Sequence, residues 1–373
     1  MDTGAAFLDP SGAAPTADPI RAIVAEMIAP NVEKIDRHGF YPEAALRSLG
    51  AAGAYAGHLT TYAPLAKRSI AAAVRAMASV GETCMSTAFC VWCQDTCGWY
   101  LEQTPNADLR DRLQPGVATG ETLGGTGLSN PVKALAGIEG FRLRGVRVDG
   151  GWCVTGVLPW VSNLGDGHWF GTIFETEDGG QRRVMAMFCC GTNGVEIRQN
   201  CHFVALEGTA TYSIRFRRAF LPDGDILADP IEDVLPRIRP GFVLLQTGMG
   251  FGVIAGAAAQ MRHDDVSYRH TNRYLPTGAT FFEDEGAALL EQMTALADTP
   301  GSGRDYLRAV LELRLAVSEL TIAATQAGVL HGGARGYLEN SAIERRQREG
   351  NFVALITPSI RHLRQEIAAL SST

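Results

Sequence analysis

The sequence predicts an α+β protein in three parts: an N-terminal helical domain over residues 1–116, a central antiparallel β-sandwich or barrel over 117–228, and a C-terminal four-helix bundle over 229–373. Two changes in hydrophobic period indicate this order, from helical spacing to strand alternation near residue 116 and back again near residue 229. Because helices, strands and helices follow one another without a βαβ alternation, a doubly wound sheet is excluded.

The composition bounds the class of protein. The 373 residues are 46% hydrophobic and 20% charged, which is ordinary for a globular protein and excludes a disordered chain. Acidic residues outnumber basic ones, 40 against 33, which gives a net charge of −7. Since nucleic-acid binding needs a basic surface, we expect no nucleic-acid partner.

Helical spacing dominates the first part of the chain. Five apolar residues recur at this spacing before Pro30, where the run is expected to end or kink: Ile20, Ile23, Val24, Met27 and Ile28. Pro42 is expected to start a further helix, and Ser69 to cap an alanine-rich helix over residues 70–81. A long apolar helix that includes Phe89, Trp92 and Trp99 follows over residues 83–101.

Three cysteines lie within that last helix. Cys90, Cys93 and Cys97 are spaced so that they share one face. A zinc site would need a second ligand pair on a loop or hairpin, and none stands at a convincing distance in the sequence. We therefore expect buried thiols and no metal site.

Neither end of the chain nor its apolar stretches predict a membrane protein. Residues 1–18 lack the basic start and apolar run of a signal peptide. The richest apolar stretch, residues 241–259, is interrupted by glycines, Gln246 and Thr247, so it predicts a buried core helix and no membrane span. We expect a cytoplasmic protein.

The central part of the sequence predicts β-strands. Apolar and polar residues alternate over 141–148, Asp149-Gly150-Gly151 predicts a hairpin turn, and a second strand begins at Trp152. Further strands are expected over residues 169–175, 183–188 and 212–216, with a turn at 177–180.

Helical spacing returns in the third part. It predicts one or two helices over 234–259 and further helices over 261–274, 283–296, 306–330 and 343–363. The glycines of 248–253 are similar to those of a dinucleotide-binding loop, but they lie in a helical run with no preceding strand. Close packing of helices on small residues is the better interpretation.

Four short motifs accompany this order of parts. Residues 160–163 read Trp-Val-Ser-Asn at the end of a predicted strand, and the glycine-rich segment 124–131 leads into the β region. Residues 268–275 contain an arginine followed two residues later by a threonine, and residues 331–337 contain paired glycines before an arginine-rich helix. With the order of parts, these motifs resemble the acyl-CoA dehydrogenase superfamily over residues 18–368, nearly the whole chain.

The resemblance implies a flavin site at the first two motifs. The family's tryptophan packs against the flavin ring, so Trp160 is expected there, and Ser162 is expected to donate a hydrogen bond toward the flavin's reactive nitrogen. Thr126 and Ser129 are the expected hydrogen-bonding residues of the loop that wraps the flavin and the substrate thioester. The expected cofactor is FAD, with FMN as a reduced co-substrate in the alternative.

The other two motifs are implied to hold the rest of the cofactor. Arg269 and Thr271 match the residues that hold the flavin diphosphate, usually that of a neighbouring subunit, and a guanidinium is the natural partner of a diphosphate. The ADP half would lie at Gly332 and Gly333, since glycines allow close backbone approach. The resemblance therefore implies a homodimer or homotetramer.

The family's catalytic glutamate is missing. Counting from Arg348 places Thr357 where most members carry it, and Ile238 occupies the position used by other members. Threonine has no pKa near neutrality and cannot act as a simple general base. Three other titratable residues are better interpreted as structural: Asp166, His168 and Glu207. The catalytic residue is left unassigned.

Three functions remain open. The first is α,β-desaturation of an acyl thioester, with an electron-acceptor flavoprotein as partner. The second is a monooxygenase of the same fold, which acts on another small molecule, needs no glutamate and receives reduced flavin from a reductase. The third is a flavin-binding homologue with altered catalysis. The missing carboxylate favours the second, whereas family frequency and the retained Trp160, Arg269 and Thr271 favour tightly bound FAD and the first. We therefore expect desaturation of an acyl thioester, with the other two functions as alternatives.

Overall fold

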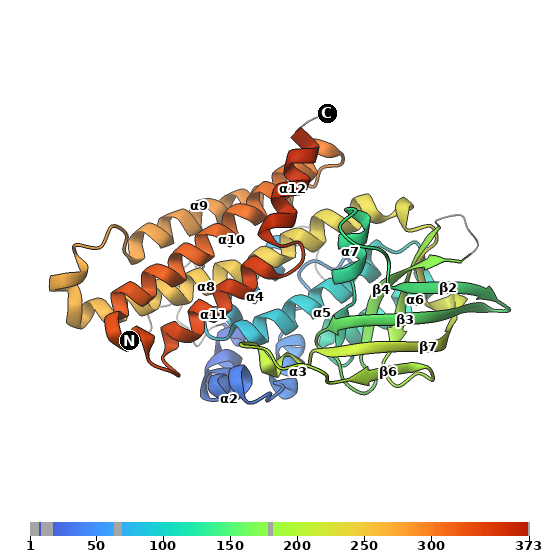
Figure 1. Ribbon diagram of the computed structural model, residues 1–373, viewed down its shortest axis with the longest axis horizontal. Helices are drawn as coiled ribbons and strands as arrows, with labels where there is room; N and C mark the ends of the chain where they lie inside the picture. The colour runs from blue at the N-terminus through green and yellow to red at the C-terminus, as the bar shows by residue number, and fades with distance from the viewer. Residues whose placement is uncertain (1–6, 9–17, 63–68, 178–181, 372–373) are drawn as a thin grey trace.

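The computed structural model describes residues 7–8, 18–62, 69–177 and 182–371. Helices from both ends of the chain form one elongated body, and the strands gather at one end of it (Figure 1). The predicted α+β class, with a sheet between two sets of helices, is confirmed. The expectation of no signal peptide in residues 1–18 falls almost entirely outside the described residues, as does most of the turn expected at 177–180.

Short helical turns precede three longer helices in the N-terminal part. The chain passes Pro30 through a π turn and a 3₁₀ turn, which is the kink expected of proline. Ser69 caps α4 as predicted, its Oγ accepting a hydrogen bond from the N–H of Ala71 at 3.0 Å. The segments are α1 Pro19–Ile23, η2 Val24–Ile28, η3 Ala29–Asn31, α2 Val32–Arg37, α3 Glu43–Ala51, α4 Ile70–Gly81, α5 Met85–Gln103 and α6 Ala107–Thr119.

An eight-stranded sheet forms the central part, in the order β6-β7-β3-β2-β4-β5-β8 with β1 beside β4. Strands β2 and β3 pair antiparallel across the predicted Asp149-Gly150 turn, where Gly150 has a φ of +71°. The pairings of β4 with β1 and with β2 are parallel, so the sheet is antiparallel-rich and not wholly antiparallel as expected. The elements are β1 Gly124–Thr126, α7 Ser129–Leu135, β2 Leu143–Val148, β3 Gly151–Val161, β4 Trp169–Thr176, β5 Arg183–Cys189, β6 Val195–Arg198, η5 Glu207–Thr209, β7 Tyr212–Pro222, η6 Asp223–Asp225 and β8 Ile226–Ala228.

The sheet curls around a core of its own. Phe188 of β5 and Phe216 of β7 lie with ring centroids 5.0 Å apart, although β4, β2 and β3 separate these strands in the sheet order. Phe170 of β4 also reaches Phe216, at 6.2 Å. Since strands far apart in the order meet across the interior, the sheet has the barrel-like character that the alternating pattern predicts.

The C-terminal part is built on one very long helix. α8 runs unbroken from Leu235 to Asn272, whereas the sequence favoured a break near residue 260. No proline or glycine lies between Ala257 and Asn272, so nothing local ends the helix there. The elements are η7 Ile231–Asp233, α8 Leu235–Asn272, α9 Ala279–Asp298, α10 Arg304–Gly332, η8 Gly333–Tyr337, α11 Ala342–Leu355 and α12 Ile360–Ser371.

Most of the apolar half of α8 is buried. By length and composition this helix could cross a membrane, but 94% of its most apolar 18-residue window is covered by the rest of the protein. Its glycines pack against α4: a Cβ on Gly252 would lie 2.7 Å from the Cα of Gly81, and one on Gly248 would lie 2.9 Å from the carbonyl oxygen of Val74. The interpretation of these glycines as helix-packing residues is confirmed.

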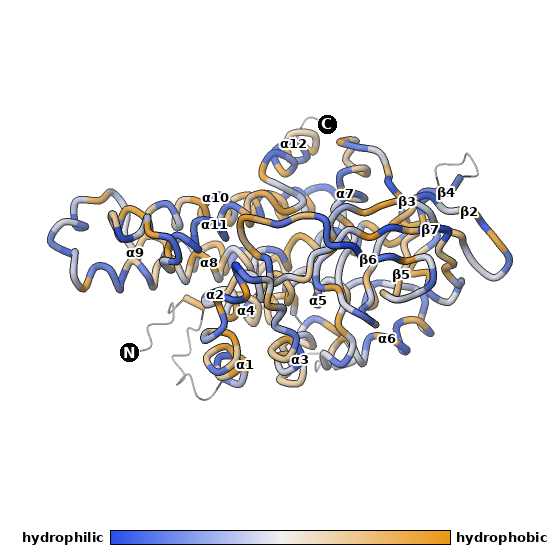
Figure 2. Tube along the Cα trace, turned by 60° about the horizontal axis from the view of Figure 1, so that its bottom comes forward, coloured by the Kyte–Doolittle hydropathy of each residue, from blue (hydrophilic) through white to orange (hydrophobic). Residues whose placement is uncertain are grey.

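The helices of the first and third parts share one hydrophobic core. Met77 of α4, Val91 of α5, Leu245 of α8 and Val317 of α10 are all buried in it. The two helical parts therefore form one body, and Figure 2 likewise shows α4 and α5 running among the C-terminal helices. The boundaries at 116 and 228 stay predictions; α6 continues past the first to Thr119, and β8 ends at Ala228, next to the second.

Asp95 and His58 form a fully buried pair among the N-terminal helices. Oδ1 of Asp95 lies 3.8 Å from Nδ1 of His58, and neither carboxylate oxygen has a hydrogen-bond partner among the described residues. Burial raises the pKa of Asp95 well above its ordinary value and lowers the pKa of His58 to about 4. The folded chain therefore favours a neutral imidazole beside a protonated carboxyl group.

Asp95→Asn is expected to stabilise the protein more at high pH than at low pH. The unfolded chain ionises Asp95 near pH 4 while the folded chain keeps the proton, so the contribution of Asp95 to the wild-type free energy of unfolding falls as pH rises above about 4. The contribution of His58 is present in both proteins and cancels in the comparison. The loss is about 1.4 kcal/mol for each pH unit over which only the unfolded state is ionised. Urea unfolding at pH 4.5 and pH 8 measures the difference.

Asp284→Asn is the matched control, because Asp284 is an exposed carboxylate on α9. It should change stability little at either pH. An equal effect of Asp95→Asn at both pH values would contradict a carboxyl group that stays protonated in the folded chain.

Candidate functional site

A cavity of about 480 Å³ lies where the sheet meets the helices. Its walls come from α5, the end of β1, α7, the end of β3, residues 203–211, α8, and α11 with the following residues to the start of α12. Most of the lining surface is apolar, and the aromatic and aliphatic lining residues are Phe89, Trp92, Trp160, Phe203, Val204, Ala205, Leu206, Phe242, Phe352, Leu355 and Ile356. Its size and apolar walls are typical of a small-molecule site.

Four of the residues predicted to bind flavin line this cavity. Thr126 and Ser129 come from the glycine-rich loop, and Trp160 and Ser162 come from the end of β3. The structure therefore brings two separate motifs to one wall.

Glycines allow the loop to approach its neighbours at backbone distance. A Cβ on Gly125 would lie 2.3 Å from the carbonyl oxygen of Ser162, and one on Gly124 would lie 2.6 Å from Sγ of Cys97 on α5. Any larger residue at these two positions would force the loop away from β3 and α5. The glycine-rich sequence is thus required by the packing of this wall.

Asn163 joins the same wall to the N-terminal helices. It is fully buried with a φ of +63°, a conformation that asparagine tolerates better than most residues. Its amide donates to the carbonyl of Gly124 at 2.7 Å, and its Oδ1 accepts from the hydroxyl of Tyr41 at 2.7 Å. The asparagine of the motif therefore has a structural role beside the cavity.

Trp160 provides a flat aromatic surface at the cavity. Its side chain is 52% exposed, and its ring meets Phe203 edge to face with centroids 6.5 Å apart. A large aromatic ring left half uncovered beside a cavity offers area to a planar ligand.

A chain of hydroxyl groups starts at Ser162. Its Oγ lies 2.6 Å from Oγ1 of Thr211, which lies 2.8 Å from Oγ1 of Thr209. Thr209 then donates to the carbonyl oxygen of Leu206 at 2.8 Å. All four residues line the cavity.

Thr357 also lines the cavity, at the position where the family's glutamate was expected. Its hydroxyl lies 3.2 Å from that of Ser129. Its carbonyl accepts from the amide of Gln246 at 2.9 Å, and the amide oxygen of Gln246 accepts from Nε of the buried Arg314 at 3.1 Å. The loop that carries Thr357 is therefore fixed from behind by α8 and α10.

None of the lining residues in the described part of the chain is an aspartate, a glutamate or a histidine. Ile238 is buried outside the lining, and Glu207 accepts a hydrogen bond from the backbone N–H of Phe203. His168 faces the carbonyl of Asn163 at 3.1 Å, and burial lowers its pKa. The described lining therefore offers no carboxylate or imidazole as a general base.

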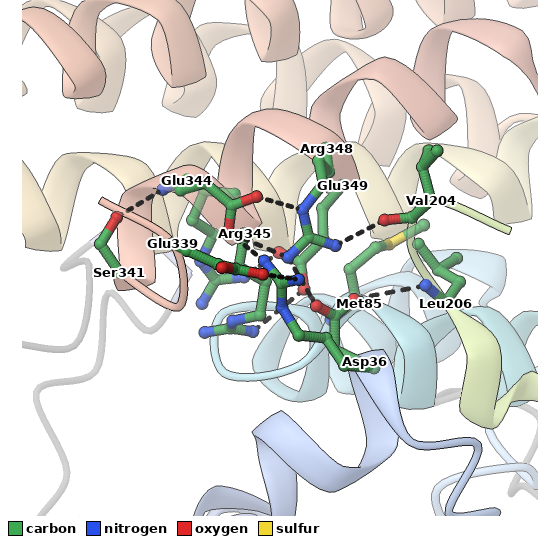
Figure 3. A network of polar contacts seen from close by, with 12 residues as sticks. Asp36, Met85, Val204, Leu206, Glu339, Ser341, Glu344, Arg345, Arg348 and Glu349 are labelled. Carbon is green, nitrogen blue, oxygen red and sulfur yellow. Dashed lines mark hydrogen bonds and ion pairs between the residues drawn. The ribbon is translucent and has the colours of Figure 1, made fainter. Parts of the chain in front are cut away.

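Two of the three cations that line the cavity, Arg348 and Lys133, are paired with carboxylates, whereas Arg361 has no ion pair within 4 Å among the described residues. Arg348 pairs with Asp36 at 2.7 Å and with Glu344 at 2.6 Å, and it donates to the carbonyl of Val204 (Figure 3). Lys133 pairs with Glu139 at 3.1 Å. Arg348 therefore ties α11 to α2 and the cavity wall.

The remaining predicted residues gather elsewhere. Arg269 and Thr271 near the end of α8 lie beside Gly332 and Gly333 at the end of α10, since Asn272 donates to the carbonyl of His331 at 3.1 Å. This end of the bundle is remote from the sheet in both views (Figures 1 and 2). None of the four lines the cavity.

Helix geometry gives the scale of the separation. Phe242 of α8 lines the cavity, and at 1.5 Å per residue Arg269 stands about 40 Å farther along the same helix. A single subunit cannot bring both groups to one ligand. The structure therefore holds two separate clusters of predicted residues.

The sequence missed three polar residues of the cavity region. Thr209 and Thr211 follow an irregular loop and carry no local signal. Gln246 was noticed only as an interruption of an apolar helix, yet a buried polar side chain must find a partner, which could have marked it.

The comparisons with known proteins agree with this fold. Residues 15–121 match the family model for the N-terminal domain of acyl-CoA dehydrogenases. The benzylmalonyl-CoA dehydrogenase of Aromatoleum aromaticum is 23% identical over 204 residues. The alignment spans 54% of this chain and 54% of that protein, so the match covers about half the length of the relative.

Solved structures match nearly end to end. The butyryl-CoA dehydrogenase of Megasphaera elsdenii has a TM-score of 0.83 and 14% identity, with 100% of this chain and 99% of that chain covered. The dibenzothiophene monooxygenase of Paenibacillus sp. A11-2 has a TM-score of 0.77 and 15% identity, with 98% and 96% covered. Other structures with this fold contain FAD, FADH2 or FMN.

Residues 15–121 of this chain therefore match the N-terminal domain of acyl-CoA dehydrogenases, and the whole chain has the fold of these solved structures.

Proposed function

We propose that this protein is a flavin-dependent monooxygenase that acts on a small, largely apolar substrate. One observation carries the choice of reaction: no described lining residue of the cavity is an aspartate, a glutamate or a histidine. Desaturation of a thioester needs a group that removes the α proton, whereas oxygenation by reduced flavin needs no such carboxylate.

The cavity residues suit a flavin ring. Trp160 supplies a half-exposed aromatic face, and hydroxyl groups of Thr126, Ser129, Ser162 and Thr357 stand around the apolar lining. This combination suits a planar ring system with a polar edge. A bound flavin would supply the redox chemistry, and the protein would position it and exclude water.

Desaturation of an acyl thioester is the second candidate. It is favoured by the similarity to a protein named as a benzylmalonyl-CoA dehydrogenase. Thr357 cannot remove the α proton, so this reaction would need a base outside the described lining. An electron-acceptor flavoprotein would then be the partner, in place of a flavin reductase.

Anaerobic and aerobic flavin absorbance separate the two reactions. The purified protein is reconstituted with FAD or FMN and mixed with butyryl-CoA or glutaryl-CoA without oxygen. We expect no bleaching, because no described lining residue is a carboxylate or imidazole that could take the α proton. When the bound flavin is reduced and oxygen is admitted, we expect the oxidised-flavin absorbance to return more slowly than for free reduced flavin.

Anaerobic bleaching by a thioester would instead establish the dehydrogenase and refute the oxygenation proposal. A protein that binds neither flavin would refute both reactions. Free flavin at the same concentration is the control in each experiment.

Thr357→Glu is expected to create the missing base. The new carboxylate would stand on the cavity wall near Ser129, where the wild-type hydroxyls are 3.2 Å apart. If the cavity admits a thioester, anaerobic bleaching by butyryl-CoA should accelerate by about 10²-fold or more, the usual contribution of a general base.

Thr357→Gln has nearly the same size without the base and should leave the bleaching rate at the wild-type level. Equal rates for the two variants, with flavin bound to both, would show that residue 357 does not face the reacting carbon.

Arg269→Ala is expected to weaken FAD binding by about 10- to 100-fold, the loss of one charge-assisted contact. Because Arg269 is exposed and remote from the cavity of its own chain, the contact would have to reach the flavin of a second subunit. The proposed assembly is therefore a homodimer or homotetramer. Titration of the apoprotein with FAD gives the Kd, and sedimentation gives the size.

Arg273→Ala is the matched control, because Arg273 caps the same helix end and lies over the ring of Tyr274. It should leave the FAD Kd near that of wild type. A monomer that binds FAD tightly would contradict the assignment of Arg269.

A further inference from the structure

In the hydroxyl chain that starts at Ser162, the direction of hydrogen bonding is fixed at the far end, Thr209. Thr209 donates to the carbonyl oxygen of Leu206, which also accepts from the backbone N–H of Thr209 at 3.2 Å. A carbonyl can only accept, so the single hydroxyl proton of Thr209 is used there. The hydroxyl oxygen of Thr209 can therefore only accept a hydrogen bond from Thr211.

The rest of the chain takes its direction from this end. Because Thr209 can only accept from Thr211, the proton of Thr211 points to Thr209 at 2.8 Å. Thr211 in turn can only accept from Ser162, 2.6 Å away. The proton of Ser162 therefore points away from the cavity, and its lone pairs face the cavity that it lines.

The backbone around the chain is held in place. Leu206 and Ala210 have φ values of +64° and +46°, in the left-handed region that non-glycine residues rarely adopt. The carbonyl of Thr209 accepts from the N–H of Asn163 at 2.9 Å, which ties this segment to the end of β3. Ser162 is 7% exposed and Thr209 is 2% exposed, so water competes little for the two end hydroxyls, whereas Thr211 is half-buried.

Among the described residues, no charged group hydrogen-bonds the three hydroxyls, since their partners are one another and the carbonyl of Leu206. Arg348, which also lines the cavity, is paired with Asp36 and Glu344. The order therefore depends on the acceptor at Leu206 alone.

We propose that Thr209 and Thr211 are positioning residues that make Ser162 a hydrogen-bond acceptor toward the cavity, so that the site selects a ligand group that carries a proton. This inference rests on the proposed flavin function. Reduced flavin carries an N–H at its reactive nitrogen, whereas that nitrogen in oxidised flavin is an acceptor. The site should therefore bind reduced flavin more tightly than oxidised flavin.

This reverses the role expected from the family resemblance, in which the hydroxyl donates to the flavin. It fits a protein that receives flavin already reduced. The preference is set by residues outside the Trp-Val-Ser-Asn motif and could not be read from that motif.

The test compares the Kd of reduced and oxidised flavin by quenching of tryptophan fluorescence, the reduced form under anaerobic conditions. In wild type we expect the oxidised-to-reduced Kd ratio to exceed one. Thr211→Val keeps the shape and removes the acceptor of Ser162, so its proton can turn toward the cavity. The ratio should fall about three- to tenfold, as expected for one hydrogen bond.

A second measurement reports the same quantity without titration. The reduction potential of the bound flavin, found by equilibration with a dye of known potential, should fall in Thr211→Val. A tenfold change in the Kd ratio corresponds to about 30 mV for a two-electron couple. Thr211→Ser keeps the hydroxyl and should restore both values, which a purely structural role of Thr211 would not explain.

The outcomes are distinct. If no flavin binds, the proposed function itself fails. If wild type binds both forms with a ratio of one or less, or if Thr211→Val leaves the ratio unchanged, only this inference is overturned. Thr211→Ala provides a second hydroxyl-free variant if the valine variant does not fold.

Discussion

The contact between the glycine-rich loop and the end of β3 is the constraint on which the cavity depends. The backbone of Gly125 meets the carbonyl of Ser162 at a distance that leaves no room for a side chain. Asn163 binds the carbonyl of Gly124 on one side and the hydroxyl of Tyr41 on the other. Sheet, loop and N-terminal helices are thereby fixed to one another, and the cavity is the space left at their junction. Neither the barrel nor the helical body would enclose it alone.

The residues that meet at this junction determine the polar character of the cavity. Its polar groups are mainly neutral hydroxyls, and two of its three cations, Arg348 and Lys133, are balanced by carboxylates outside the lining. Such hydroxyls order a ligand by the direction of hydrogen bonds, since a hydroxyl can donate or accept according to its neighbours. The carbonyl of Leu206 fixes that direction beside Ser162, and the amide of Gln246 holds the backbone carbonyl of Thr357 in place. Groups that contact the lining hydroxyls and backbone from behind thus determine which hydrogen bonds the cavity can offer a ligand.

The sequence predicted what depends on local pattern. Period changes located the sheet and the helices, Asp149-Gly150 located a hairpin, and motif residues such as Trp160 and Ser162 do line one cavity. Long-range consequences were missed. The continuity of α8 through residue 260 reflects the absence of a stop signal, and the parallel pairing of β4 depends on a crossover that no local pattern encodes. Thr209 and Thr211 matter only because the fold brings them to Ser162.

The length of α8 explains why the predicted flavin residues fall into two groups. Its buried first half touches the cavity through Phe242 and holds Thr357 through Gln246, while its exposed last turns carry Arg269 and Thr271. The glycine contacts with α4 make the buried half a rigid support, because helices packed at backbone distance cannot slide without a clash. Rigid spacing of about 40 Å along one helix forbids both groups from meeting one ligand within a chain. If both motifs serve a flavin, as the family pattern implies, the second group must serve the cavity of another copy, and assembly then becomes a condition of cofactor binding.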